Sequence, residues 1–193
     1  MAEAARGDDG PVGAAKKGQT AEVEAMFGDA AGSTTVGRAV TINRPVAEVW
    51  AFYRDLGNAP LYMDEVERVD VTNPKRPHWV AHGIGGRIVE WDAEITEEEP
   101  EQVLAWQAVD ASYANAGRAT FKAVAGRGTV VTLTLTYDPP GGTVGKLVAK
   151  LFQRDPAIQA RRNLRRLKQL LETGEIATAA RNKQLDAEGR THE

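Results

Sequence analysis

Histidines and carboxylates recur at a spacing of two or four residues on neighbouring stretches of the chain. His78 and His82 begin and end one short stretch, and Glu90 and Asp92 lie in the alternating stretch that follows a glycine-rich turn. If the two stretches pair as an antiparallel hairpin with a three-residue loop, His78 lies opposite Asp92. A histidine beside a carboxylate is the core of many general-base arrangements, and two histidines with carboxylates also resemble a metal-ligand set. His78 and Asp92 are therefore candidate catalytic residues.

The same polar residues also fit the hydrated side of a β-sheet. Alternation puts them on the side opposite a set of tryptophans, where cross-strand charge pairs contribute only ~0.2–1 kcal/mol each. The inverse arrangement would bury several charges at high cost. We therefore expect a solvated polar face that binds no metal ion. Tyr137, at the end of another strand, is a further catalytic candidate, although a core tyrosine with its hydroxyl at the rim is the simpler interpretation.

The other side of the same strands is apolar and rich in tryptophan. Period-two alternation puts these residues on one face: Trp79, Ala81, Val89, Trp91, Ala93, Ile95, Leu104, Trp106, Ala108, Ala119, Phe121, Ala123, Val131, Leu133, Leu135 and Tyr137. Large rings beside alanines leave either a packed core or a cavity. We expect a cavity of ~300–1,000 Å³, with its mouth near Leu61 and near the start of a long helix. The expected ligand-binding residues are Trp79, Trp91, Trp106, Phe121, Leu133, Tyr137, Leu147, Leu151 and Met63.

Turn residues and hydrophobic periodicity divide the middle of the chain into one strand, two short helices, six more strands and a long helix. The expected strands are 36–42, 66–72, 78–82, 87–97, 102–109, 117–124 and 129–138, and the short helices are 45–55 and 59–63. The long helix begins after Thr143, is interrupted at Asp155, and runs to Thr173, where Gly174 is a natural stop. Seven twisted strands curl, so we expect an α+β fold in which the sheet wraps around the long helix.

Composition divides the chain into one domain and two polar tails. We expect a disordered N-terminal tail over 1–34, a ligand-binding domain over 35–174 and a flexible C-terminal tail over 175–193. The net charge is only −3 and no basic stripe crosses the domain, which argues against nucleic acid as a partner. The chain has no cysteine, no signal peptide and no apolar run of the roughly 18 residues that span a bilayer, so we expect a cytoplasmic protein. A weak homodimer stays open as an alternative.

Basic residues gather in the second half of the long helix: Arg161, Arg162, Arg165, Arg166 and Lys168. Such a cluster could contact an acidic partner, a phosphate-bearing ligand or a membrane surface. A solvated helix face is the simpler interpretation.

Five blocks of sequence follow the expected order of elements. They are TINRPVAEVWAFYRDLGNAPLYM, HWVAHGIGGRIVEWDAEITEEEPEQVLAWQAVD, NAGRATF, VTLTLTYDPPGG and GKLVAKLFQRDPAIQARRNLRRLKQLLETGEI, and together they span about residues 35–176. These blocks resemble the START-like (SRPBCC) superfamily, the birch-pollen-allergen-like group also called polyketide cyclase/dehydrase and lipid transport. The resemblance is closest to its bacterial branch of largely uncharacterised ligand-binding proteins.

The resemblance implies a helix-grip fold and a hydrophobic ligand, such as a lipid, a polyketide or an aromatic metabolite, held between the sheet and the C-terminal helix without a cofactor. The alternative activity within this superfamily is that of a polyketide aromatase/cyclase or dehydratase. The aromatase/cyclases use an arginine on a pocket-facing strand together with aromatic hydroxyls. The central strand here reads VEWDAEI, with carboxylates and no arginine. We therefore expect a binding protein rather than an enzyme.

Overall fold

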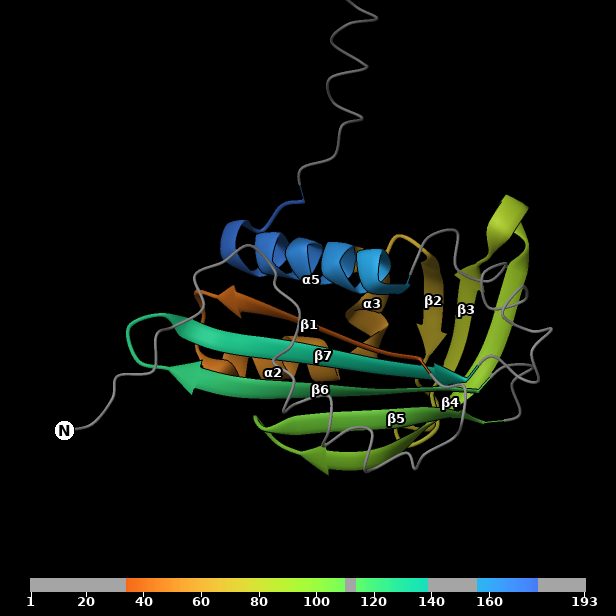
Figure 1. Cartoon of the computed structure of the whole chain (residues 1–193), viewed down its shortest axis with the longest axis horizontal. Coiled ribbons are helices and arrows are strands. Elements are labelled where there is room, and N and C mark those ends of the chain that lie inside the picture. Colours follow the sequence, from red (N-terminus) through yellow and green to blue (C-terminus); the bar gives the residue numbers. More distant parts are fainter. Residues whose placement is uncertain (1–33, 110–113, 139–155, 177–193) are drawn as a thin grey trace, which may run out of the picture.

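An antiparallel sheet of seven strands organises the molecule, and its strand order is β1-β7-β6-β5-β4-β3-β2. The computed structural model describes residues 34–109, 114–138 and 156–176. The strands are β1 (Thr34–Ile42), β2 (Val66–Asp70), β3 (His78–His82), β4 (Ile88–Glu99), β5 (Val103–Val109), β6 (Ala114–Val124) and β7 (Gly128–Asp138). The helices are α2 (Val46–Arg54), α3 (Ala59–Tyr62) and α5 (Pro156–Thr173), with short 3-10 turns η1 (Leu56–Asn58) and η2 (Ile84–Gly86). The sheet curls around α5 (Figure 1), which confirms the helix-grip fold.

Helix α5 lies across β1 on the concave side of the sheet (Figure 1). It buries Ala160, Leu164 and Leu167, which are at most 2% exposed and follow the helical repeat. The helix ends where sequence predicts, at Gly174, whose φ of 76° is the left-handed conformation that glycine adopts without strain. Arg44, just after β1, donates to the carbonyl oxygens of Leu171 and Glu172 at the last turn. These contacts fix the C-terminal end of α5 beside the end of β1.

Two expectations about element boundaries need correction. The expected strand 117–124 begins too late: residues 114–116 also belong to β6, because the ladder with β7 continues to the pair of Ala114 and Asp138. Backbone pairing with a long neighbouring strand outweighs the weak strand preference of alanine and asparagine. The 3-10 turn η1 was not expected, and it forms where the Asp55 carboxylate accepts a hydrogen bond from the Gly57 amide at 3.2 Å. The expected start of the long helix at Thr143 lies outside the described residues.

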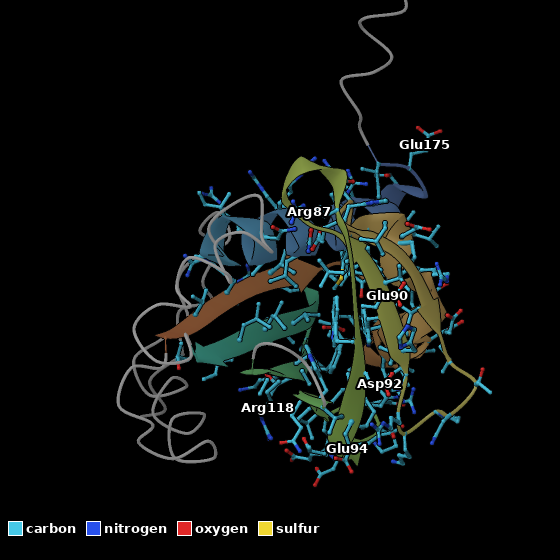
Figure 2. All side chains as sticks on the ribbon, turned by 90° about the vertical axis from the view of Figure 1, so that its right-hand side faces the viewer. Arg87, Glu90, Asp92, Glu94, Arg118 and Glu175 are labelled. Atoms are coloured by element: carbon cyan, nitrogen blue, oxygen red, sulfur yellow. The ribbon has the colours of Figure 1, made fainter. Side chains whose placement is uncertain are left out.

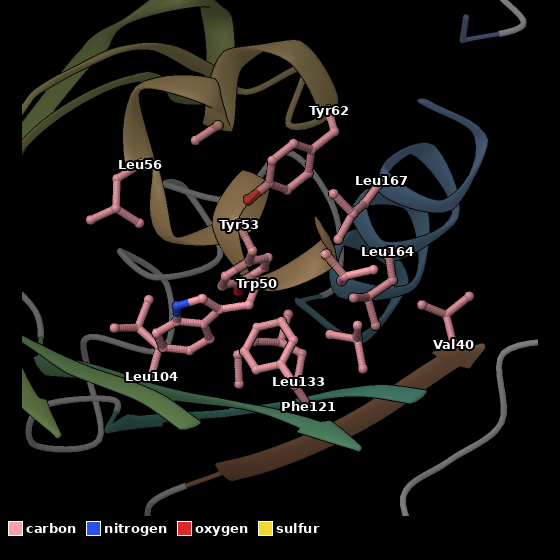
Figure 3. Close-up of a cluster of buried hydrophobic side chains, with 14 of the residues drawn as sticks. Val40, Trp50, Tyr53, Leu56, Tyr62, Leu104, Phe121, Leu133, Leu164 and Leu167 are labelled. Atoms are coloured by element: carbon pink, nitrogen blue, oxygen red, sulfur yellow. The ribbon is translucent and has the colours of Figure 1, made fainter. Parts of the chain in front are cut away.

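An aromatic cluster packs α2 and α3 against the middle of the sheet (Figure 3). Phe121 of β6 meets Trp50 and Tyr53 of α2 edge to face, with ring centroids 5.2 and 5.3 Å apart. Such edge-to-face pairs are favourable beyond the area that they bury. The central part of the concave face is therefore filled by side chains of the short helices as well as by α5.

A partly buried ion pair joins α2 to β4. A shift of register between Ile95 and Glu97 places Glu98 opposite Leu104, on the concave face. Its carboxylate accepts hydrogen bonds from Arg54 Nε at 2.6 Å and Lys75 Nζ at 2.8 Å. These bonds lower the pKa of Glu98 to about 2.

Replacing Glu98 with glutamine is expected to lower the free energy of unfolding at neutral pH. A depressed pKa stabilises the fold above the ordinary value of 4.5, and this contribution disappears as the pH falls through the folded-state value of about 2. Chemical denaturation of both proteins between pH 7 and pH 2 measures the difference. The exposed neighbour Glu99→Gln is the control. A deficit of Glu98→Gln that stays constant down to pH 2 would contradict the assigned ion pairs.

Candidate functional site

Two tryptophans stack on each other where β3 pairs with β4. Trp79 lies directly opposite Trp91, as the three-residue loop predicts, and their rings are 5.9 Å apart and nearly parallel at 10°. Trp79 also packs against the buried cluster that holds Val69 of β2. Both indoles are only half-buried. This stack therefore offers a flat apolar surface on the concave side.

A third tryptophan extends this surface onto β5. Trp106 pairs with Gly117 of β6, and a Cβ atom at Gly117 would overlap the indole ring. The ring therefore covers the glycine on the concave face and packs against the buried cluster. Gly117 is a residue that sequence reasoning missed. Its signal was a glycine inside a strand, which often marks a close approach of another group.

The apolar residues of the concave face fall into two groups by burial. Toward the ends of β6 and β7 that adjoin the Gly126 turn they are enclosed, with Leu104, Phe121 and Val131 at most 6% exposed. Toward the opposite end the two alanines Ala81 and Ala93 are enclosed, but six residues stay half-buried: Trp79, Val89, Trp91, Trp106, Ala108 and Leu135. The N-terminal half of α5 lies toward this second end of the sheet (Figure 1). We call these six residues the open aromatic end.

One polar atom within the open aromatic end has no partner. The indole nitrogen Nε1 of Trp79 is buried and makes no hydrogen bond, alone among the enclosed side-chain nitrogens and oxygens of the described residues. Buried N–H groups are paired in the great majority of cases, so an unpaired one calls for an explanation. A ligand that accepts this hydrogen bond would supply one.

Two tyrosines from the short helices add hydroxyl groups to the concave side. Tyr53 and Tyr62 are each 3% exposed, and their ring centroids are 6.3 Å apart. Burial raises the pKa of both phenols, and the charge of Glu65 adds to the effect at Tyr62. Both phenols are therefore neutral at physiological pH. The helical stripe of residues 45–55 predicted a buried Tyr53, but nothing in the sequence indicated that Tyr62 would meet it.

The remaining expected ligand-binding residues are placed as follows. Phe121 and Leu133 lie on the concave face but are enclosed, at 6% and 4% exposure, and Met63 packs against the same cluster. Tyr137 pairs with Thr34 and Asn115 in the sheet, and its side chain is outside the described part. Leu147 and Leu151 also lie outside the described residues.

The histidine and the carboxylates occupy the opposite, convex face. His78 Nδ1 lies 2.7 Å from Asp92 Oδ1, as the hairpin register predicts, and His78 Nε2 is 3.6 Å from Glu90. The hydrogen bond with His78, helped by one from Arg76, holds the pKa of Asp92 below its usual range. Figure 2 shows Glu90, Asp92 and Glu94 following one another along β4. The side chains of His78 and Asp92 are 38% and 34% exposed, as expected of cross-strand pairs at the surface.

Some residues do not follow the alternation expected of their strands. Alternation with the apolar set puts Val80, Thr132 and Thr134 on the outer face, where we expect contact with water, yet they are at most 6% exposed. An outward position in the middle of this sheet therefore does not by itself mean exposure. Ala123, expected inside, is exposed near the Gly126 turn. Among the described residues no group of three or more histidines and carboxylates could hold a metal ion.

Some basic side chains of α5 bind to other parts of the protein, and others are exposed to solvent. Arg162 and Arg166 both pair with Asp64 in the turn before β2, and Arg166 also donates to the carbonyl oxygen of Tyr62. Lys168 donates to the Thr41 carbonyl oxygen at 2.7 Å. These side chains join α5 to α3 and β1, which corrects the expectation of a fully solvated cluster. Across the described ranges, no helix is long and apolar enough to cross a membrane.

Comparison with known proteins adds a family and a fold. Residues 33–172 match the family model described as polyketide cyclase / dehydrase and lipid transport. A curated relative, an uncharacterised 17.2 kDa protein in the melC2-rnhH intergenic region of Streptomyces lincolnensis, is 30% identical over 108 residues. The match covers 56% of this chain and 71% of the relative.

Solved structures show the same fold. The crystal structure of DR_A0006 from Deinococcus radiodurans is 34% identical, with a TM-score of 0.58 over 74% of this chain and 100% of that one. The di-domain ARO/CYC BexL from the BE-7585A biosynthetic pathway is 14% identical, with a TM-score of 0.59 over 73% of this chain and 50% of that one. At that identity the second likeness concerns the fold alone.

Proposed function

Because the chain belongs to the polyketide cyclase/dehydrase and lipid transport family, we propose that it binds a hydrophobic small molecule, such as a lipid, a polyketide or an aromatic metabolite, against the open aromatic end. One observation carries the proposal: three large indole rings on the concave face stay half-buried, whereas Leu104, Phe121 and Val131 of the same face are enclosed. Apolar surface on the inside of a curved sheet is costly to leave in water. A ligand that covers these rings would remove that cost.

The distribution of polar groups supports binding rather than catalysis. The pair of His78 and Asp92 is on the face opposite the tryptophans, so it cannot reach a molecule held against them. The ion pair of Arg54 and Glu98 does face inward, but its charges neutralise each other. Proton transfer needs an acid or base within hydrogen-bond reach of the reacting atom. The likeness to BexL concerns the fold, and a fold alone carries no activity.

Titration with the neutral naphthyl probe N-phenyl-1-naphthylamine tests this function. We expect the probe to gain fluorescence and to quench tryptophan emission with saturation at one probe per chain. Replacing Trp106 with alanine should weaken binding roughly tenfold, because it removes one large ring from the proposed surface. The control is Ile88→Ala, an apolar residue that is 49% exposed and pairs with His82 on β3. Equal losses in the two variants, or no saturable binding to the unmodified chain, would refute the proposal.

A further inference from the structure

Helix α5 presents a basic face to solvent. Five exposed residues recur along it at intervals of three or four positions, so they lie on one side of the helix: Ile158, Arg161, Arg162, Arg165 and Gln169. This side is opposite the buried stripe that begins at Ala160, and we call it the outer face of α5. Over Pro156–Thr173 the helix carries five basic residues and a single acidic one, Glu172. The outer face is therefore positively charged, in a chain whose net charge is −3.

Contacts at the two borders of the outer face hold it in this orientation. Lys168 on one border is bound to β1, and Arg166 on the other border is bound to α3. Within the face, Arg162 pairs with the turn before β2. Arg161 and Arg165 are exposed and make no hydrogen bond or ion pair with the described part of the chain. These two guanidinium groups are therefore available to an anionic partner outside the molecule.

Charge is unevenly distributed between α5 and the sheet. In Figures 1 and 2 alike, α5 lies at the same end of the molecule as the turn η2, which is followed by the exposed Arg87. Figure 2 shows Glu90, Asp92 and Glu94 following one another along β4 away from that end. An anionic surface attracts the first end and repels the second, so it orients the molecule with α5 toward it.

Exposed apolar side chains on α5 and α3 indicate what kind of anionic surface fits. Ile158 on the outer face is 57% exposed, and Leu61 of α3, the helix beside α5, is 52% exposed. A membrane-surface helix combines arginines, which bind headgroup phosphates, with apolar side chains that enter the boundary between headgroups and acyl chains. A soluble polyanion would bind the arginines and leave Ile158 in water. These observations favour a bilayer over a soluble polyanion.

We infer that the outer face of α5 docks reversibly on the surface of an anionic phospholipid bilayer. Arg161 and Arg165 bind the headgroup phosphates, and Ile158 enters the headgroup layer. The contact is peripheral, because a few charges and one or two apolar side chains give only weak attachment. The inference goes beyond the proposed function, since it concerns where the chain is placed rather than which molecule it holds. In this orientation the N-terminal half of α5 lies against the bilayer.

Cosedimentation of the full chain with sucrose-loaded vesicles tests the inference. We expect binding to vesicles of equal parts phosphatidylglycerol and phosphatidylcholine at low salt, but not to pure phosphatidylcholine. Binding should disappear at about 1 M salt, where the screening length falls to about 3 Å. The double variant Arg161→Gln with Arg165→Gln should bind at least about tenfold more weakly, because each arginine near an anionic surface contributes roughly fivefold. The control is Lys122→Gln with Arg127→Gln, which has the same net charge but is changed at the end of β6.

A third variant distinguishes a bilayer from a soluble polyanion. Ile158→Gln should weaken vesicle binding severalfold and leave binding to heparin unchanged, because only the bilayer accepts the apolar side chain. Vesicle binding that is the same with and without Ile158 would exclude the bilayer as the partner.

Two other results would overturn the inference. One is no binding of the unmodified chain to the anionic vesicles at low salt. The other is an equal loss of binding in the α5 double variant and in its control. Both leave the proposed function standing, because none of the changed residues belongs to the open aromatic end. Titration of each variant with N-phenyl-1-naphthylamine in the absence of vesicles should therefore match that of the unmodified chain.

Discussion

Replacing Gly117 with valine is expected to weaken binding of N-phenyl-1-naphthylamine at least about tenfold and to lower the free energy of unfolding by about 1–3 kcal/mol. A Cβ atom at this position would overlap the indole ring of Trp106. The ring must then leave its place over β6 and move into the space that the ligand is proposed to use. Overpacking accounts for the loss of stability, and the displaced ring accounts for the loss of binding.

The control for Gly117→Val is Ala116→Val. Ala116 is the adjacent residue of β6, so its side chain is on the opposite face, where it pairs with Gln107. Valine is a good strand former, and we expect this variant to bind the probe and to unfold like the unmodified chain. Denaturant titration measures stability, and fluorescence titration measures binding. If Gly117→Val matched the control in both measurements, the assigned position of the Trp106 ring would be wrong.

Replacing Phe121 with alanine should have the larger effect on stability, about 3–5 kcal/mol. Phe121 is 6% exposed and meets both Trp50 and Tyr53 edge to face. Its removal leaves a cavity between β6 and α2 and deletes two aromatic contacts at once. A loss of this size is a large fraction of the stability of an ordinary domain.

Urea unfolding followed by circular dichroism would measure this loss. Phe121→Leu, which retains most of the buried volume, should lose clearly less than Phe121→Ala. A cost for Phe121→Ala below about 1 kcal/mol, typical of a surface substitution, would mean that α2 does not pack on β6 as described.

The sequence predicts the sheet well because its signals are local. Strict alternation over residues 87–97 and a glycine-rich turn of three residues fix the hairpin register, and the pairs Trp79–Trp91 and His78–Asp92 follow from it. The turn after Val124 fixes β6 against β7 in the same way. Where one turn sets the register, two faces of a strand can be assigned from composition alone.

The contacts that sequence reasoning missed depend on tertiary structure. The register shift between Ile95 and Glu97, which brings Glu98 to the concave face, has no distinctive sequence signal. The meeting of Tyr53 with Tyr62 depends on how η1 turns the chain between two short helices. The pairing of Asp64 with Arg162 and Arg166 likewise joins residues about a hundred positions apart. None of these contacts could be inferred from periodicity.

The central claim is that an apolar molecule rests on the concave face at the open aromatic end. A crystal structure of the chain with N-phenyl-1-naphthylamine tests it most directly. The account predicts electron density for the naphthyl ring against Trp79, Trp91 and Trp106. Probe density on the convex face beside His78 and Asp92, or indoles packed together with no room for the probe, would contradict it.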